Sequence, residues 1–501
     1  MVKGGLPFLG WLMLLTLSVQ GQRAGVDVMG SPIPGITAHG HHAIGINPSL
    51  LATERPFVGR PDRATRKDSL DRRARRAMGR SERMRFVSGF EGTVQVQTPF
   101  LDGTSLVRMA QGDAPRTLED RRVLAQQLGG EKTAVDAQLR WVGWSRHGRL
   151  GGWGWTIEDR YMASANPSAL LADYVMLGPA SSVFDQVLLQ DGTIVDSDSL
   201  TEAQFAIAES GIRNDGGLLA FELLEGSRFA VQHVRSYGVG MGIQLLDSRA
   251  LVIGAGLAAR YYRGTGYYEV DTENQTAFAA FNRGFGNELL SPDATLGSAL
   301  RPAGFGVALD VAVRAHVADL WFASLAITEV GSMDWQGESY GLNDPVASLT
   351  SWSQGGGGAL DLLNDGLAPA SLFLEATPER RVVSMPTRAR LNGGLYLGQR
   401  TLVGIELAAP LNQALLRQPA EVGVGVRSQL GPILGMGGVR WQEQGVVRWP
   451  VALVWSRNKQ SVQIGLATDD LFGFLAPERR WGWGWSLTRT LFPARGLEEG
   501  K

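Results

Sequence analysis

Apolar and polar residues alternate along most of the chain after residue 217. In SYGVGMGIQLL, for example, Tyr237, Val239 and Met241 share one face, and glycine takes the positions between them. Further segments with the same period, separated by turn-forming residues, continue to Phe492. A period of two places successive side chains on opposite faces of an extended chain. The pattern therefore predicts an all-β structure of antiparallel strands.

The stretch RALVIGAGLAARYYRG, residues 249–264, also matches the Gly-x-Gly-x-x-Ala pattern of a dinucleotide-binding turn. Asp271 and Glu273 stand near the position of a ribose-binding acid. Such a turn must continue into a helix whose N-terminus meets the pyrophosphate. Here the alternation runs through the motif, and the next residues include two glycines and four tyrosines, which form helices poorly. We therefore predict a strand and no bound cofactor.

The face opposite the apolar one is rich in glycine, which makes up 65 of the 501 residues. A soluble β-sandwich turns its polar face to water and rarely needs runs of glycine there. Strands with aromatic residues near their ends fit a barrel whose apolar face meets lipid, and small inner residues leave space for a plug or a lumen. We predict a transmembrane antiparallel β-barrel of about 12 to 16 strands. The alternative is a soluble β protein whose glycines mark bulges.

The pattern also predicts which polar residues face the lumen and which aromatic residues lie at the membrane interface. Asp310, Arg314 and Arg260 fall on the glycine-rich face and are expected to point into the lumen. Asp310 and Arg314 stand four residues apart on one strand, too far to pair with each other, so each is expected to pair across strands or to line an aqueous path. The expected membrane-interface aromatic residues are Trp481, Trp483, Trp485, Tyr237 and Tyr261.

The first residues predict export. Lys3 precedes an apolar run, residues 6–19, that is short for a bilayer span and has the length of a signal-peptide core. We assign residues 1–21 to a signal peptide, with a membrane anchor as the alternative. No later run reaches the roughly 18 apolar residues that a membrane helix needs. The chain has no cysteine, which excludes disulfides and thiolate metal sites.

The remaining chain divides into three parts. Residues 22–130 form an N-terminal region expected to act as a plug or hatch, residues 131–492 form the barrel, and residues 493–501 form a tail. Within the first part, residues 55–85 hold twelve Lys and Arg against four acids. No aromatic residues are interleaved for base stacking, so this segment suits anionic lipid headgroups better than nucleic acid.

Two short helices and one long loop are expected around the barrel. Residues 117–130 have acids in the first turn and glycine at the end, as a helix does. Thr201 and Gln204 have the spacing of a capping box, which predicts a second helix in LTEAQFAIAESG. Residues 332–386 are expected to form a long loop. The sequence leaves open whether these pieces lie outside the wall or inside it.

Catalytic and metal-binding patterns are not evident in the sequence. HGHH, residues 39–42, could attract a metal ion, but no carboxylate stands beside it and no predicted strand or helix holds it. Nucleophile elbows, zincin helices and phosphate-binding lysine loops are lacking. We expect no catalytic residue, cofactor or metal site, and a protein that is not an enzyme. A net charge of −1 gives no general attraction to nucleic acid, and none is expected as a partner.

Several stretches together resemble a known family. HHAIGINPSLLA is similar to an early Asn-Pro-Ala element with Ser49 at its third position, and GFGVALDVAVRAHVADLWFASLAITEVGSMDW is similar to a central hairpin. With the final WGWGWSLTRTLF, they resemble outer-membrane β-barrel proteins of diderm bacteria that are distantly similar to long-chain fatty-acid transporter barrels. The resemblance implies contact with outer-membrane lipid and insertion by the barrel-assembly machinery. The basic segment 55–85 and the nine residues after Phe492 depart from the pattern.

Three functions are compatible with these observations. The first is an outer-membrane barrel that binds or passes small apolar molecules, with the N-terminal region as a hatch. The second is a non-transporting barrel that serves as an anchor or accessory for secretion or surface assembly. The third is a soluble exported β protein that binds carbohydrate through exposed tryptophans. A continuous polar or aromatic path through the barrel would favour the first, and a packed lumen the second.

Overall fold

The structure is a computed structural model of the 501-residue chain. It describes residues 29–38, 40–52, 85–97, 117–130, 133–148, 151–214, 220–248, 250–272, 276–281, 302–317, 320–341, 377–397, 401–412, 419–443, 446–457, 462–472 and 480–491. The predicted signal peptide, the C-terminal tail and all of the basic segment except Arg85 lie outside the described residues.

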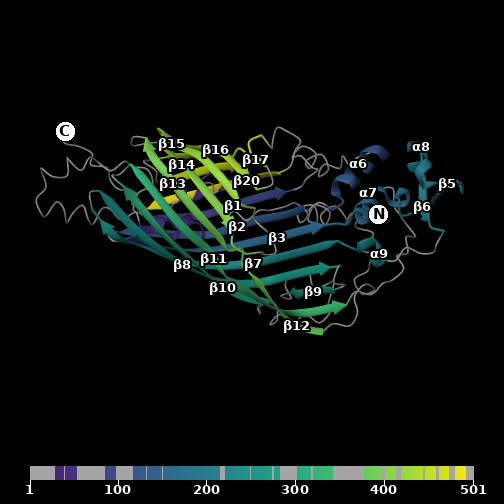
Figure 1. Ribbon diagram of the computed structural model, residues 1–501, viewed down its shortest axis with the longest axis horizontal. Coiled ribbons are helices and arrows are strands. Elements are labelled where there is room, and N and C mark those ends of the chain that lie inside the picture. The colour runs from purple at the N-terminus through teal and green to yellow at the C-terminus, as the bar shows by residue number, and fades with distance from the viewer. Residues whose placement is uncertain are drawn as a thin grey trace, which may run out of the picture.

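Fourteen antiparallel strands close into a barrel, which confirms the predicted fold class (Figure 1). In chain order the strands are β1 (Arg85–Gln97), β2 (Thr133–Gly148), β3 (Gly151–Asn166), β7 (Arg228–Asp247), β8 (Leu251–Asp271), β10 (Gly304–Val317), β11 (Trp321–Gly341), β13 (Arg388–Leu397), β14 (Thr401–Pro410), β15 (Glu421–Leu430), β16 (Ile433–Gln442), β18 (Val451–Arg457), β19 (Val462–Thr468) and β20 (Arg480–Leu491). Each strand pairs with the next, and β1 also pairs with β20. Closure gives the backbone of every wall strand a partner on both sides.

Three shorter strands continue wall strands beyond interruptions, which makes seventeen strands in the sheet. β9 (Thr276–Phe281) precedes β10 in the chain and pairs with β8 and β11 in the part of the sheet beyond the first residue of β10. β12 (Thr377–Ser384) precedes β13 along β11, and β17 (Val447–Arg448) precedes β18 along β16. Pro386 and Pro450 stand in the last two gaps, where a residue without an amide hydrogen cannot donate to the ladder.

The connections at the two ends of the barrel differ in length. At one end the strands are joined by residues 149–150, 248–250, 318–320, 398–400, 431–432 and 458–461. At the other end the connections are longer, and the longest are residues 98–132, 167–227 and 342–376. Transmembrane barrels of the outer membrane have this asymmetry, with short periplasmic turns and long external loops.

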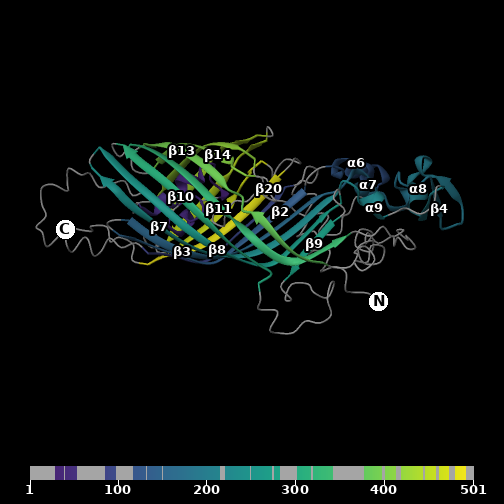
Figure 2. The same ribbon diagram turned by 60° about the horizontal axis from the view of Figure 1, so that its bottom comes forward.

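A small ordered unit lies beyond the long-connection end (Figures 1 and 2). It contains α6 (Leu118–Leu128), α7 (Ala169–Leu177), α8 (Glu202–Phe205), α9 (Ala220–Leu224) and the sheet of β4 (Gln186–Leu189), β5 (Ile194–Asp196) and β6 (Ala208–Ile212). Leu118 of α6 packs with Leu177 and Val187, so the two connections share one core. No helix among the described residues is long and apolar enough to cross a membrane.

The outer face of the barrel is apolar around its circumference. Val307 is 62% exposed and Leu466 is 64% exposed, on strands far apart in the wall. Other outward apolar residues on the wall strands include Trp141, Trp153, Met241, Leu257, Leu309, Leu325, Leu391, Ile405, Val424, Trp441, Leu453 and Leu487. A band of this extent exceeds the apolar patches of soluble proteins and matches the lipid-facing band of a membrane barrel.

Several boundaries differ from those expected from the sequence. The wall starts at Arg85, not at residue 131, because β1 pairs with both β2 and β20. The expected loop at 332–386 contains the end of β11 and all of β12. The capping box of Thr201 is present, but its helix α8 ends at Phe205 because the chain enters β6 at Ala208. Residues 251–264 of the glycine motif are part of β8, so no helix follows the glycines.

We predict that Leu309→Arg weakens folding into lipid bilayers by about 2–4 kcal/mol, the cost of an arginine facing the middle of a bilayer. Leu309 is half exposed on the outer face near the middle of β10. Ile194→Arg is the matched control because Ile194 is equally exposed but belongs to β5 of the small unit. Guanidinium titrations of both variants in phospholipid vesicles measure the difference. Equal effects of the two substitutions would contradict a lipid-facing β10.

Candidate functional site

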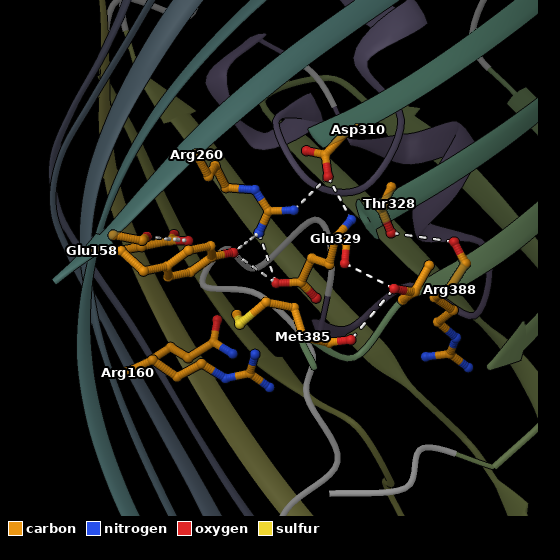
Figure 3. Close-up of polar contacts among 12 residues, drawn as sticks. Glu158, Arg160, Arg260, Asp310, Thr328, Glu329, Met385 and Arg388 are labelled. Atoms are coloured by element: carbon orange, nitrogen blue, oxygen red, sulfur yellow. Dashed lines mark hydrogen bonds and ion pairs between the residues drawn. The ribbon is translucent and has the colours of Figure 1, made fainter. Parts of the chain in front are cut away.

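Residues 29–38 and 40–52, called the interior segment below, lie inside the barrel (Figures 1 and 3). The segment contains a short α-helix, α3 (Pro34–Thr37), and two 3-10 turns, η1 (Gly40–Ala43) and η2 (Pro48–Ala52). Each of its described residues is buried, and it contacts the inner faces of strands on opposite sides of the wall. The segment therefore fills part of the lumen.

The glycines of the inner face allow the wall and the interior segment to approach closely. A Cβ atom at Gly256 would lie 2.1 Å from the carbonyl carbon of Pro48, and one at Gly423 would meet the carbonyl oxygen of Pro32. Similar approaches occur at Gly242, Gly404 and Gly425. These glycines give the segment the space that side chains would otherwise occupy.

Polar side chains of the wall bind the backbone of the interior segment. Glu406 accepts a hydrogen bond of 2.6 Å from the Gly35 amide. Arg427 donates to the carbonyl oxygen of Thr37 at 2.9 Å, and Arg440 donates to that of Ser31 at 2.5 Å. These contacts supply partners to buried backbone groups that regular secondary structure does not satisfy. The segment is thus held by several separate hydrogen bonds.

A buried group of ion pairs joins β8, β10 and β11 (Figure 3). Arg260 bonds Asp310 at 2.5 Å and Glu329 at 2.7 Å, and all three side chains are nearly inaccessible to solvent. Tyr262 accepts a hydrogen bond from Arg260 and lies 3.1 Å from Glu329. Buried charges require such pairing, since an unpaired charge in this environment costs several kcal/mol.

A β-bulge places Glu329 in this group. The register of β10 and β11 shifts between Leu309 and Val311, and Glu329 takes a positive φ of 60°. Its amide donates to Asp310 at 2.7 Å, and its carbonyl oxygen accepts from Thr387 at 2.9 Å. A positive φ is unfavourable for a residue with a side chain, so these contacts hold a strained conformation.

An apolar cluster lies next to the ion pairs, toward the end of the barrel that carries the long connections. Its members include Trp335 and Met333 of β11, Tyr267 and Tyr262 of β8, Val135 of β2, Met162 of β3, Val234 of β7, Phe278 of β9, Ala308 of β10 and Met385 from the gap after β12. Trp335 is fully buried and stacks on Tyr267 with a ring separation of 5.2 Å. Its indole nitrogen has no hydrogen-bond partner among the described residues. Convergence of so many strands places this cluster in the interior.

The structure places the three polar residues singled out from the sequence on the inner face. Arg260 and Asp310 bind each other across β8 and β10. Arg314 lies apart from them, where it donates to the Tyr396 hydroxyl at 3.3 Å and lies over the Phe322 ring. Arg314 therefore contacts aromatic side chains that belong to other strands.

The aromatic residues singled out from the sequence are distributed over two regions. Tyr237 and Tyr261 are neighbours on the outer face, with ring centroids 6.3 Å apart, and they line a groove of about 440 Å³ together with Arg263. Trp485 lies over Gly92 of the adjacent strand. Trp481 and Trp483 belong to β20, but their side chains lie outside what the structure describes.

Sequence reasoning missed Glu329, Trp335 and Glu91. The bulge at Glu329 reverses the inward and outward assignment of the following residues, so a strict period of two gives Trp335 the wrong face. Glu91 belongs to β1, where the alternation in FEGTVQVQ was a usable signal inside a segment assigned to the N-terminal region.

Comparisons with known proteins yield structural matches. No protein-family model and no curated protein sequence matches the chain. The toluene transporter TodX of Pseudomonas putida matches at 10% identity over 95% of this chain and 98% of its own, with a TM-score of 0.40. A FadL homologue of Pseudomonas aeruginosa matches at 10% identity over 95% and 99%, with a TM-score of 0.41. The Ralstonia pickettii toluene transporter TbuX matches at 9% identity over 95% and 96%, with a TM-score of 0.38. The similarity concerns the fold alone.

We predict that Gly256→Leu displaces the interior segment, because its side chain would overlap the backbone of Pro48 and Ser49. The chain has no cysteine, so Ala43→Cys, at a fully buried position, supplies a single reporter thiol. Maleimide labelling of this thiol is expected to be about tenfold faster in the Gly256→Leu background, as local opening increases. Gly393→Leu is the control, since a Cβ there meets no atom closer than 3.9 Å. Unchanged labelling with Gly256→Leu would refute the close packing.

We also predict that Arg260→Ala destabilises the barrel by about 3–5 kcal/mol, because Asp310 and Glu329 would remain buried without their guanidinium. The control is Arg228→Ala, which removes a solvent-accessible partner of Asp271 and is expected to cost about 0–1 kcal/mol. Guanidinium unfolding in detergent micelles compares the two variants. A cost for Arg260→Ala as small as that of the control would show that the group is solvated.

Proposed function

We propose that the protein is an outer-membrane β-barrel that binds and passes small apolar molecules through its interior. The observation that carries the proposal is an aromatic and apolar cluster enclosed by a wall whose outer face is itself apolar. The outer face requires lipid around it, and the enclosed cluster offers an apolar molecule an environment shielded from water.

The direction of the connections supports a location in an outer membrane. Short connections at one end and long ones at the other correspond to the periplasmic and external ends of such barrels. The signal peptide expected at residues 1–21 and insertion by the barrel-assembly machinery complete this proposal. The chemistry proposed is binding and passage, so the protein is proposed not to be an enzyme.

The interior segment packs part of the lumen, which by itself favours a non-transporting barrel, so passage requires the interior to rearrange. Residues 29–52 obstruct the lumen beyond the apolar cluster, and separate hydrogen bonds from Glu406, Arg427 and Arg440 hold them. Hydrogen bonds to charged groups contribute about 1.5–3 kcal/mol each, so displacing one end of the segment at a time costs less than displacing all of it. In the proposal, an apolar molecule enters the cluster from the long-connection end and continues when the segment shifts.

Trp335→Ala tests the proposal. The purified protein is expected to bind 1-N-phenylnaphthylamine, an apolar fluorophore, and the variant is expected to bind it at least about tenfold more weakly because the centre of the cluster is lost. Trp321→Ala is the control, since Trp321 is exposed on the outer face. Competition with short alkanes, monoaromatic compounds and fatty acids then defines the preferred class.

A barrel that acts as an anchor or accessory for surface assembly is the competing proposal. Its binding surface would be the small ordered unit at the long-connection end, which has its own cores. In that case the fluorophore would bind wild-type protein and both tryptophan variants equally, through the detergent-covered outer face alone.

A further inference from the structure

Two histidines of the interior segment lie against a glutamate of the wall. His42 Nε2 is 2.8 Å from Glu91 Oε1, and His41 Nε2 is 3.5 Å from the same oxygen. One ligand atom of each of the three residues lies within 4.8 Å of the others. All three residues are buried, with Glu91 fully so. The wall therefore supplies the carboxylate that the sequence around HGHH does not contain.

His41 is the unusual member of this cluster. Its side chain is almost fully buried, yet neither ring nitrogen has a hydrogen-bond partner among the described residues. Its Nε2 faces Glu91 without the geometry of a hydrogen bond. A buried polar group without a partner is costly, and binding a cation is one way to satisfy it.

The surroundings hold the ligands in place. Arg140 bonds Glu91 Oε2 at 2.8 Å and is itself paired with Glu158, which fixes the carboxylate beside His42, whose Nε2 lies 2.8 Å from Oε1 and 3.0 Å from Oε2. Gly143 makes room for His41, since a Cβ there would lie 2.2 Å from its ring. Carboxylates and imidazoles that bind metals are commonly oriented by such outer contacts.

We propose that His41, His42 and Glu91 form a binding site for a divalent transition metal ion such as Zn²⁺. Two imidazole nitrogens and one carboxylate oxygen are a common zinc ligand set, with a fourth position left for water. Metal–ligand bonds of about 2.0–2.2 Å require neighbouring ligand atoms roughly 3.4 Å apart. The two contacts to Glu91, of 2.8 and 3.5 Å, are close to this spacing, and the ligand atoms as a set, which lie within 4.8 Å of one another, must draw together around the ion.

The ion fastens the interior segment to the barrel wall. His41 and His42 belong to η1, whereas Glu91 belongs to β1, so one metal ion bridges two parts of the chain about 50 residues apart. Because the ligands are buried, the ion is loaded during folding or during an opening of the segment. The site is inferred from the geometry of these residues alone, and an ion there would oppose the displacement of the segment that the proposed passage requires.

The experiment uses the full-length protein refolded from denaturant into detergent with and without Zn²⁺, followed by dialysis against a weak chelator. Wild-type protein is expected to retain one zinc ion per chain by elemental analysis and to unfold at a higher temperature than the zinc-free form. Refolding with Co²⁺ should give visible absorption bands typical of nitrogen and oxygen ligands.

His41→Ala, His42→Ala and Gly143→Val are expected to lower zinc affinity at least about tenfold, and to remove the cobalt bands. His41→Ala and Gly143→Val leave the contact of Glu91 with Arg140 intact, so loss of metal cannot be attributed to breaking that ion pair. His316→Gln is the matched control, because His316 stacks on Tyr396 away from the cluster. The proposal is overturned if wild-type protein retains no metal, or if the three variants retain as much as His316→Gln.

Discussion

The apolar outer face of a closed sheet is the constraint on which the rest of the structure depends. Side chains of a strand point alternately to the two faces, so a wall that gives one face to lipid must turn nearly all of its polar residues inward. Arg260, Asp310, Glu91 and Arg140 accordingly lie in the interior, where water cannot fully solvate them. The interior must therefore provide their partners.

Two kinds of partner meet this need. Some charged residues bind one another across neighbouring strands, as Arg260 and Asp310 do. Others bind the backbone of residues 29–52, as Arg427 and Arg440 do. The interior segment thus has an electrostatic role as well as a steric one, because its carbonyl oxygens accept hydrogen bonds from buried guanidinium groups. Glycines such as Gly256 and Gly423 bring its backbone within reach.

The sequence predicted the strands of the barrel wall better than the contacts inside the barrel. A period of two is set by each strand alone, so the β7–β8 hairpin and the inward face of Asp310 and Arg260 could be recognised locally. The bulge at Glu329 depends on contacts with Asp310 and Thr387, which are distant in sequence. The meeting of Glu91 with His42 depends on where the interior segment lies, and no local pattern encodes that position.

The boundary between the charged group and the apolar cluster determines which part of the interior can move. Tyr262 belongs to both, since its ring packs in the cluster while its hydroxyl bonds Arg260. Separating Arg260 from its carboxylates would expose buried charges at a cost of several kcal/mol, whereas Met385 in the cluster has a flexible side chain that repacks at low cost. In the proposed function, an entering molecule therefore displaces apolar side chains and the hydrogen-bonded segment, while the ion pairs keep β8, β10 and β11 in register.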